Sequence, residues 1–225
     1  MRVVVVFILL MAGMLSCNQS PQEKTKKEKI NISNTSFFYV YDTIPKIYQY
    51  REIVNGMYEQ FHRVYGLRDG YGRHLIVERY TQEGRLTEAY NFNMDSLYVL
   101  DHMVVNSKGK KEKAFIYHNQ LFPLSNVETH FATKFSGVLD STVMLYEVFR
   151  KLNTFTEREV LNQKLDCMKL NERIRVTNID LKSKKESPPM ENQLVHYFGK
   201  GLGLIEWHDT KFSQHFVLED IISQK

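Results

Sequence analysis

The 225-residue sequence has little of three features that would restrict the range of possible functions. It holds two cysteines, no apolar run as long as the about 20 residues of a membrane-spanning helix, and no large excess of either charge. Hydrophobic residues make up 43% and charged residues 25%, which is typical of a globular protein. The composition therefore excludes a disordered chain, a collagen and a membrane protein with many helical spans.

The net charge of +4 is too small to predict a nucleic-acid-binding surface. Basic residues cluster at 24–29, 108–113 and 182–185, and the last two clusters flank expected turns. A nucleic-acid-binding domain would concentrate them in one stripe. We therefore expect no nucleic-acid partner.

The first residues have the pattern of a bacterial export signal. Arg2 precedes the apolar run Val3 to Leu15, and the small residue Ser16 precedes Cys17. The run Met-Leu-Ser-Cys at 14–17 resembles the lipobox of bacterial lipoproteins, in which the cysteine becomes the lipid-carrying first residue. The resemblance implies a signal peptide over 1–16, lipidation of Cys17 and a lipid anchor in a membrane. The alternative is a plain secretory signal followed by an unrelated cysteine.

Residues 17–36 are polar, with no large apolar residue before Ile30, and predict a flexible tether. A single β-rich domain is expected over 37–225. No acidic run follows Cys17; in lipoproteins that resemble this one, such a run accompanies export to the cell surface. Its absence favours the periplasmic face of the outer membrane.

A lipidated Cys17 would leave Cys167 without a disulfide partner. Cys167 lies in a strand-like stretch, and no local motif supplies the base and positive surroundings that a nucleophilic thiol needs. We expect it to be a small hydrophobic core residue.

From residue 37 onward, short segments of alternating apolar and polar residues are separated by glycine-containing turns. Asn55-Gly56 is a strong two-residue hairpin signal. The first six predicted strands, which should pair in sequence order as an antiparallel meander, are 46–54, 57–65, 73–80, 85–92, 97–105 and 111–118.

Residues 119–165 give a mixed signal. The run Val143 to Leu152 has helical spacing but is also β-branched and aromatic, and Thr156 to Glu159 fits a helical capping box. We favour strand over most of this segment, with at most one short helix near residue 157. Residues 168–181 then alternate clearly, and only Glu172 breaks the inward apolar pattern. The last predicted strands are 193–198, 202–208 and 212–218.

About ten antiparallel strands in one domain must curl, close or split into two sheets. We predict a mainly β fold, built as a strongly curved antiparallel sheet that forms a half-barrel or open barrel. At most one or two short helices are expected.

The stretch Tyr197 to Trp207, with its Lys-Gly turn and following Gly-Leu-Ile, resembles the last hairpin of many bacterial periplasmic lipoproteins. Those proteins have a curved antiparallel sheet similar to the lipoprotein carriers LolA and LolB. Residues 160–167 resemble the strand that precedes this hairpin. Together with the lipobox, the resemblance implies a Bacteroides-like cell-envelope lipoprotein, and it says little about activity.

Several motifs of catalytic or metal chemistry are incomplete. The glycines at 199, 201 and 203 are followed by a predicted strand, so they indicate a β-turn and not a phosphate-binding loop. A Gly-x-Ser-x-Gly nucleophile motif is absent. Glu147 and Glu206 are the kind of carboxylate pair that a glycosidase needs, but any β domain offers such pairs. We expect no enzymatic activity and no cofactor.

Three histidines, His196, His208 and His215, fall on successive predicted strands, and Glu206 shares a strand face with His208. A His/His/Glu site is conceivable if the strand register aligns them. Surface or half-buried histidine is the commoner situation, and we expect no metal.

Aromatic residues are the one feature in excess, at 12% of the chain. They can fill a core or line a concave binding face. We expect the curved sheet to bind an apolar or amphiphilic ligand, such as a lipid. The alternative is an assembly module that docks on another envelope protein. The predicted ligand contacts are Tyr90, Phe92, Tyr98, Phe115 and Trp207.

Overall fold

The computed structural model describes residues 32–106, 109–137, 139, 141–211 and 214–223. In this part of the chain, one 3-10 helix, η1 (Ile32–Phe37), precedes thirteen strands. The strands are β1 (Lys46–Glu52), β2 (Glu59–Asp69), β3 (Gly72–Thr81), β4 (Leu86–Asn93), β5 (Val99–Val105), β6 (Lys111–Lys113), β7 (Phe115–Asn119), β8 (Thr129–Ser136), β9 (Thr142–Val160), β10 (Gln163–Asp180), β11 (Met190–Gly199), β12 (Gly203–Asp209) and β13 (His215–Ser223).

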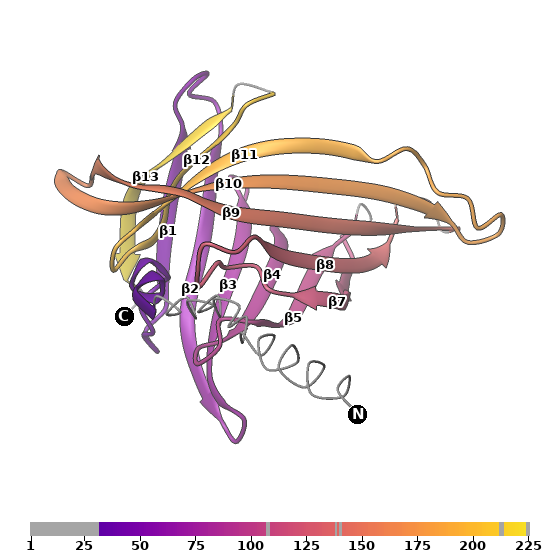
Figure 1. The fold of residues 1–225 in the computed structure, drawn as a ribbon, viewed down its shortest axis with the longest axis horizontal. Coiled ribbons are helices and arrows are strands. Elements are labelled where there is room, and N and C mark those ends of the chain that lie inside the picture. Colours follow the sequence, from indigo (N-terminus) through magenta and orange to yellow (C-terminus); the bar gives the residue numbers. More distant parts are fainter. Residues whose placement is uncertain (1–31, 107–108, 138, 140, 212–213, 224–225) are drawn as a thin grey trace, which may run out of the picture. The chain divides into compact units, whose positions relative to one another are not determined.

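All thirteen strands belong to one antiparallel sheet that nearly closes into a barrel (Figure 1). Strands that follow each other in the sequence pair with each other, except β6 and β7, and β1 also pairs with β13. The one break in the ring lies between β6 and β7, and we call residues 111–119 the seam. The predicted fold class, a strongly curved antiparallel sheet forming an open barrel, is confirmed.

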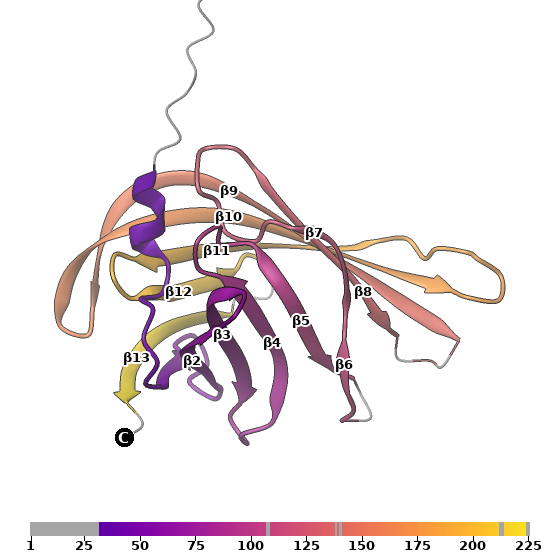
Figure 2. The same cartoon turned by 90° about the horizontal axis from the view of Figure 1, so that it is seen from below.

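Strands β6 and β8 lie near each other at the seam (Figure 2). Ala114 joins β6 directly to β7, and its amide donates a hydrogen bond of 2.8 Å to the His102 carbonyl of β5. On the other side, the amide and hydroxyl of Ser136 in β8 donate to Glu112 Oε1 of β6, at 3.0 and 2.9 Å. The predicted strand 111–118 is therefore interrupted at Ala114 and forms two strands, β6 and β7.

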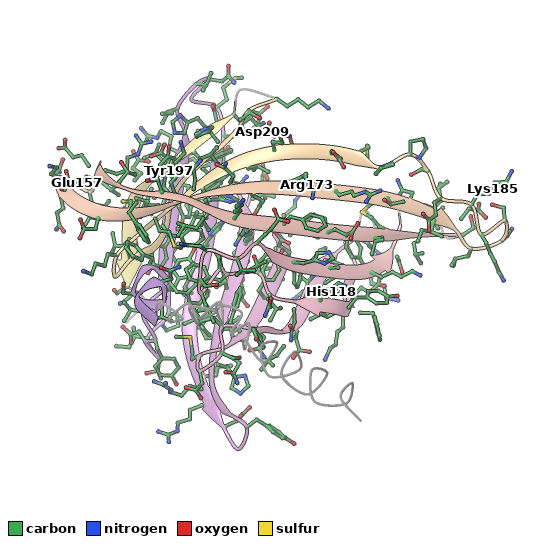
Figure 3. All side chains as sticks on the ribbon, in the orientation of Figure 1. His118, Glu157, Arg173, Lys185, Tyr197 and Asp209 are labelled. Atoms are coloured by element: carbon green, nitrogen blue, oxygen red, sulfur yellow. The ribbon has the colours of Figure 1, made fainter. Side chains whose placement is uncertain are left out.

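Strands β9 and β10 form a long ribbon that crosses the rest of the sheet (Figure 1). Figure 3 shows Glu157 of β9 and Lys185, in the turn after β10, at its opposite ends. The ribbon includes both segments with helical signals, 143–152 and 156–159, so the short helix near residue 157 is wrong. Val143–Arg150 of β9 is hydrogen-bonded between β8 and β10, and this pairing overrides local helical spacing.

The β1–β2 turn is longer than the predicted two-residue hairpin. Strand β1 ends at Glu52, and the Glu52 carboxylate accepts hydrogen bonds of 2.7 to 3.0 Å from the amides of Val54, Asn55 and Gly56. Gly56 has a positive φ of 65°, whereas Asn55 does not. A side chain that caps the turn thus replaces the backbone geometry of a tight Asn-Gly hairpin.

One end of the barrel interior is filled by aromatic rings. Phe38, which follows η1, contacts Tyr39, Phe92 and Phe122 with ring centroids 4.9 to 5.6 Å apart. These residues belong to the main hydrophobic core. The described fold therefore begins before the predicted domain boundary at residue 37, and Asn34 is already buried, with its side-chain amide donating to the Pro123 carbonyl at 3.3 Å.

The signal sequence, Cys17 and most of the predicted tether lie outside the described residues. Among the described residues, no helix has the length and apolar character that a membrane crossing requires.

Candidate functional site

The barrel interior holds a cavity of about 510 Å³ at the end away from the aromatic core. Its wall is built by β2, β3 and β4 on one side and by β9 to β13 on the other. The lining also includes residues 82–83 of the β3–β4 turn and Gln214 before β13, so the turns at this end form its rim. The volume is within the about 300–1,000 Å³ common for small-molecule sites.

Polar side chains enter the cavity because strand alternation points them inward. Arg79 of β3 and Glu88 of β4 form an ion pair of 2.7 Å. The second carboxylate oxygen of Glu88 accepts a hydrogen bond from the Tyr90 hydroxyl at 2.6 Å and lies 3.3 Å from His102 Nε2. The other ring nitrogen of His102 lies 3.3 Å from the Thr133 hydroxyl, which extends the network across to β8.

A second buried ion pair stands on the β9–β11 side. Arg150 Nε of β9 donates to Glu172 of β10, and both side chains are almost fully buried. Arg150 also donates to the Leu121 carbonyl at 3.3 Å. Nδ1 of His196 on β11 lies 3.4 Å from Glu172 Oε2, without the geometry of a hydrogen bond.

His62 is a residue of the cavity wall whose two ring nitrogens both lack a hydrogen-bond partner in the described structure. Its side chain is 1% exposed. The ring is held between Tyr50, at a centroid distance of 4.6 Å, and Trp207, on which it stacks at 5.7 Å. A buried polar group without a partner costs free energy and calls for an explanation.

Burial and the ion pairs set the charge states of the cavity. Burial alone would raise the pKa values of Glu88 and Glu172, but the Arg79 and Arg150 guanidinium groups overcome it and hold both pKa values well below the ordinary range. Burial lowers the pKa of His62 far below its usual value, with Arg79 adding to the effect. At neutral pH the site therefore holds two balanced ion pairs beside a neutral imidazole.

The predicted ligand-contact residues fall in three places. Tyr90 and Trp207 line the cavity. Phe92 is buried in the aromatic core below it. Tyr98 and Phe115 lie on the surface, 37% and 64% exposed, with Tyr98 just before β5 and Phe115 at the seam. The five residues thus do not form one site, and whether any of them binds a ligand stays a prediction.

Sequence reasoning missed most of the polar cavity. One signal was available, since Glu172 is the residue that interrupts the alternation of its strand. His62 was not singled out, because a histidine within a strand pattern does not by itself indicate burial; the structure buries it together with Val64 on the inward face of β2. Charged residues such as Arg79, Glu88 and Arg150 are ordinary in a strand, so their presence alone does not predict a polar cavity.

The three histidines considered for a metal site in the sequence analysis do not lie together in the structure. His196 faces the cavity, whereas His208 and His215 lie side by side with Glu206 on the other face of the sheet. Cys167 is fully buried, and burial raises the pKa of its thiol to about 11, so it is protonated at neutral pH. Gly199 and Gly203 flank the β11–β12 turn, as expected.

Comparison with known proteins gives structural likeness only. No protein-family model matches the chain, and no curated protein matches its sequence. A crystal structure of a "putative lipoprotein" from Parabacteroides distasonis is 13% identical, with a TM-score of 0.50, and the match covers 83% of this chain and 98% of that one. A "putative exported protein with YmcC-like fold" from Bacteroides fragilis is 11% identical, with a TM-score of 0.41, and the match covers 82% and 99%.

The likeness to the first of these structures shows a similar fold and nothing about activity. The first neighbour is described as a lipoprotein, in agreement with the kind of protein that the lipobox and the C-terminal hairpin predicted. No family model and no curated protein supports the resemblance to LolA and LolB, which rests on the curved sheet alone.

Proposed function

We propose that this chain is a non-enzymatic, lipid-anchored envelope protein that binds a small amphiphilic ligand inside its barrel. The observation that supports this most is the cavity of about 510 Å³, in which an aromatic and aliphatic wall surrounds His62, a buried imidazole without a partner. Cys17 would carry the anchor, on the periplasmic face of the outer membrane.

The cavity wall has both apolar and polar parts. Trp207, Phe216, Val148, Ile174 and Leu194 supply apolar surface, and the polar groups described above supply hydrogen bonds. A purely apolar ligand would leave His62 unsatisfied, whereas a ligand with one hydroxyl or amide group would give it a partner. An amphiphile therefore fits better than a hydrocarbon.

The charge states of the cavity argue against acid–base catalysis. A general acid needs a pKa near the working pH, and the arginines hold Glu88 and Glu172 ionised far below it. Glu147 and Glu206, the carboxylates considered for glycosidase chemistry, each lie within 3.2 Å of a different histidine, His130 and His215 respectively.

The test is native mass spectrometry of residues 19–225, which include every described residue, purified gently from cells. An adduct that is lost on organic extraction is expected, and its occupancy should fall in His62→Phe. His118→Phe, on an exposed histidine, is the matched control. A clean apo mass for the unmodified chain would reject tight ligand binding.

A second candidate function is docking on another envelope protein through the seam. Phe115 and Tyr117 of the edge strand β7 are 64% and 52% exposed and contact each other edge to face at 4.7 Å. Exposed aromatic pairs on a strand with one unpaired edge suit a protein interface. An apo mass, together with co-purification of an envelope protein that Phe115→Ser abolishes, would favour this function.

A further inference from the structure

The outer face of β12 and β13 brings three metal-ligating side chains together. Trp207 points into the cavity, so strand alternation places its neighbours Glu206 and His208 on the opposite face. His208 pairs directly with His215 in the β12–β13 register. One candidate ligand atom from each of Glu206, His208 and His215 lies within 4.8 Å of the other two.

The distances between these atoms are close to those between ligand atoms in a tetrahedral zinc site. His215 Nε2 lies 2.9 Å from Glu206 Oε1. Around zinc, with bonds of about 2.0–2.1 Å, neighbouring ligand atoms are about 3.3 Å apart. The His215–Glu206 pair therefore needs little movement, and the His208 nitrogen needs to approach by about 1.5 Å at most. Both rings are only partly buried, so side-chain rotation can supply this movement.

Arg158 forms an ion pair with the other oxygen of the Glu206 carboxylate. Its Nε lies 3.6 Å from Glu206 Oε2, so Oε1 remains directed toward His215. Outer-shell partners of this kind commonly position metal ligands. The guanidinium charge also opposes a bound cation, so we expect a weaker site than a structural zinc centre.

The two rings are inclined to each other. The His208 and His215 planes meet at 63° with centroids 5.3 Å apart, and His208 Nδ1 is buried without a hydrogen-bond partner in the described structure. The pair His118 and His130, beside Glu147, has the same residue types, but its rings stack at 27° and 4.2 Å. Parallel stacked rings direct their nitrogens alongside one another and not toward a common point. This second pair is a matched control.

We propose that Glu206, His208 and His215 bind a divalent transition-metal ion, with zinc as the best match. Two imidazoles and one carboxylate are a ligand set that zinc favours, and they leave a fourth position for water or for a group from a partner. The site is on the opposite face of the sheet from the cavity, and it does not depend on the proposed amphiphile.

The experiment is calorimetric titration of the full chain, purified in detergent and freed of metal, with zinc chloride. We expect one equivalent to bind at this site, and His208→Gln and His215→Gln should each weaken binding by more than about tenfold. His118→Gln combined with His130→Gln should leave the affinity unchanged. Zinc binding that is absent, or that survives both His208→Gln and His215→Gln, would overturn the proposal.

A second measurement needs no substitution. Zinc should protect His208 and His215 from modification by diethylpyrocarbonate, while exposed His118 stays reactive. His118 is a suitable control because it lies far from the site: Figure 3 shows it well apart from Tyr197, which neighbours His208. Equal reactivity of all three histidines with and without zinc would count against the site even if a variant failed to fold.

Discussion

Glu172 interrupts the alternation of β10 because it lies inside the barrel and is paired there with Arg150. A buried carboxylate is tolerated only when an opposite charge and hydrogen bonds replace its water. Both conditions are met, since Arg150 and Glu172 are hydrogen-bonded and Arg150 also donates to a backbone carbonyl.

The first prediction concerns this pair. Arg150→Met leaves Glu172 buried without its partner and should lower the free energy of unfolding by about 3–5 kcal/mol. The double variant Arg150→Met with Glu172→Leu removes both charges and should recover most of the loss. Urea unfolding at neutral pH measures both. Equal losses in the single and double variants would show that packing, and not the unpaired charge, determines the cost.

The second prediction concerns His62. Its pKa is lowered by burial, so the unfolded chain takes up a proton at a higher pH than the folded chain. The stabilising contribution of the neutral ring is complete above about pH 6.5 and is lost as the pH falls below that value.

His62→Phe should therefore reduce the loss of unfolding free energy between about pH 7.5 and about pH 5.5. The slope should not vanish, because burial also lowers the pKa of His196. His118→Phe should keep the full slope. Urea titrations at the two pH values test this, and an unchanged slope in His62→Phe would contradict it.

At the scale of strands and turns, local patterns located most elements but not their ends. Alternation identified β1 to β5 and β10 to β13, because half-buried strands show it clearly. The β1–β2 turn was misjudged because the Glu52 carboxylate caps it through the amides of residues 54–56, and the Asn-Gly pair by itself does not indicate such a side-chain cap. The burial of His62 on β2 was not predicted, because a core pattern is expected to carry apolar residues at its inward positions.

The third prediction concerns the β11–β12 turn. Gly203 has a φ of 86°, and an added Cβ would lie 2.2 Å from the Tyr39 ring. Gly203→Ala should therefore cost backbone strain and also displace Tyr39 from the aromatic core. Gly84 has a φ of 73° and open space around it, so Gly84→Ala measures the strain alone.

We expect Gly84→Ala to lower the unfolding free energy by about 1 kcal/mol and Gly203→Ala to lower it by at least about 2 kcal/mol. Thermal and urea unfolding of both variants give the comparison. Equal losses would mean that the N-terminal aromatic segment moves aside without cost.

At the scale of the whole molecule, the curved sheet could be predicted and its closure could not. The number of strands and the short turns required curling. The pairing of β1 with β13 joins residues far apart in the sequence, and no local pattern records it. The cavity depends on this closure, because its wall combines strands from both halves of the chain.

The last prediction concerns the seam, where the ring of strands is incomplete. Strand β6 has three residues and pairs only with β5, whereas β10 is paired along most of its length with β9 and β11. Local opening should therefore be easiest at the seam, and backbone amides of residues 111–119 should exchange with deuterium faster than those of β10.

Glu112 bridges the seam to Ser136, so Glu112→Ala should increase exchange in β6 and at the end of β8 and leave β10 unchanged. Glu128→Ala, on an exposed residue away from the seam, is the control. Hydrogen exchange with peptide-level mass spectrometry resolves these segments. If exchange rose evenly across the sheet in Glu112→Ala, the barrel would open as a single unit. The seam would then not be a site of local opening.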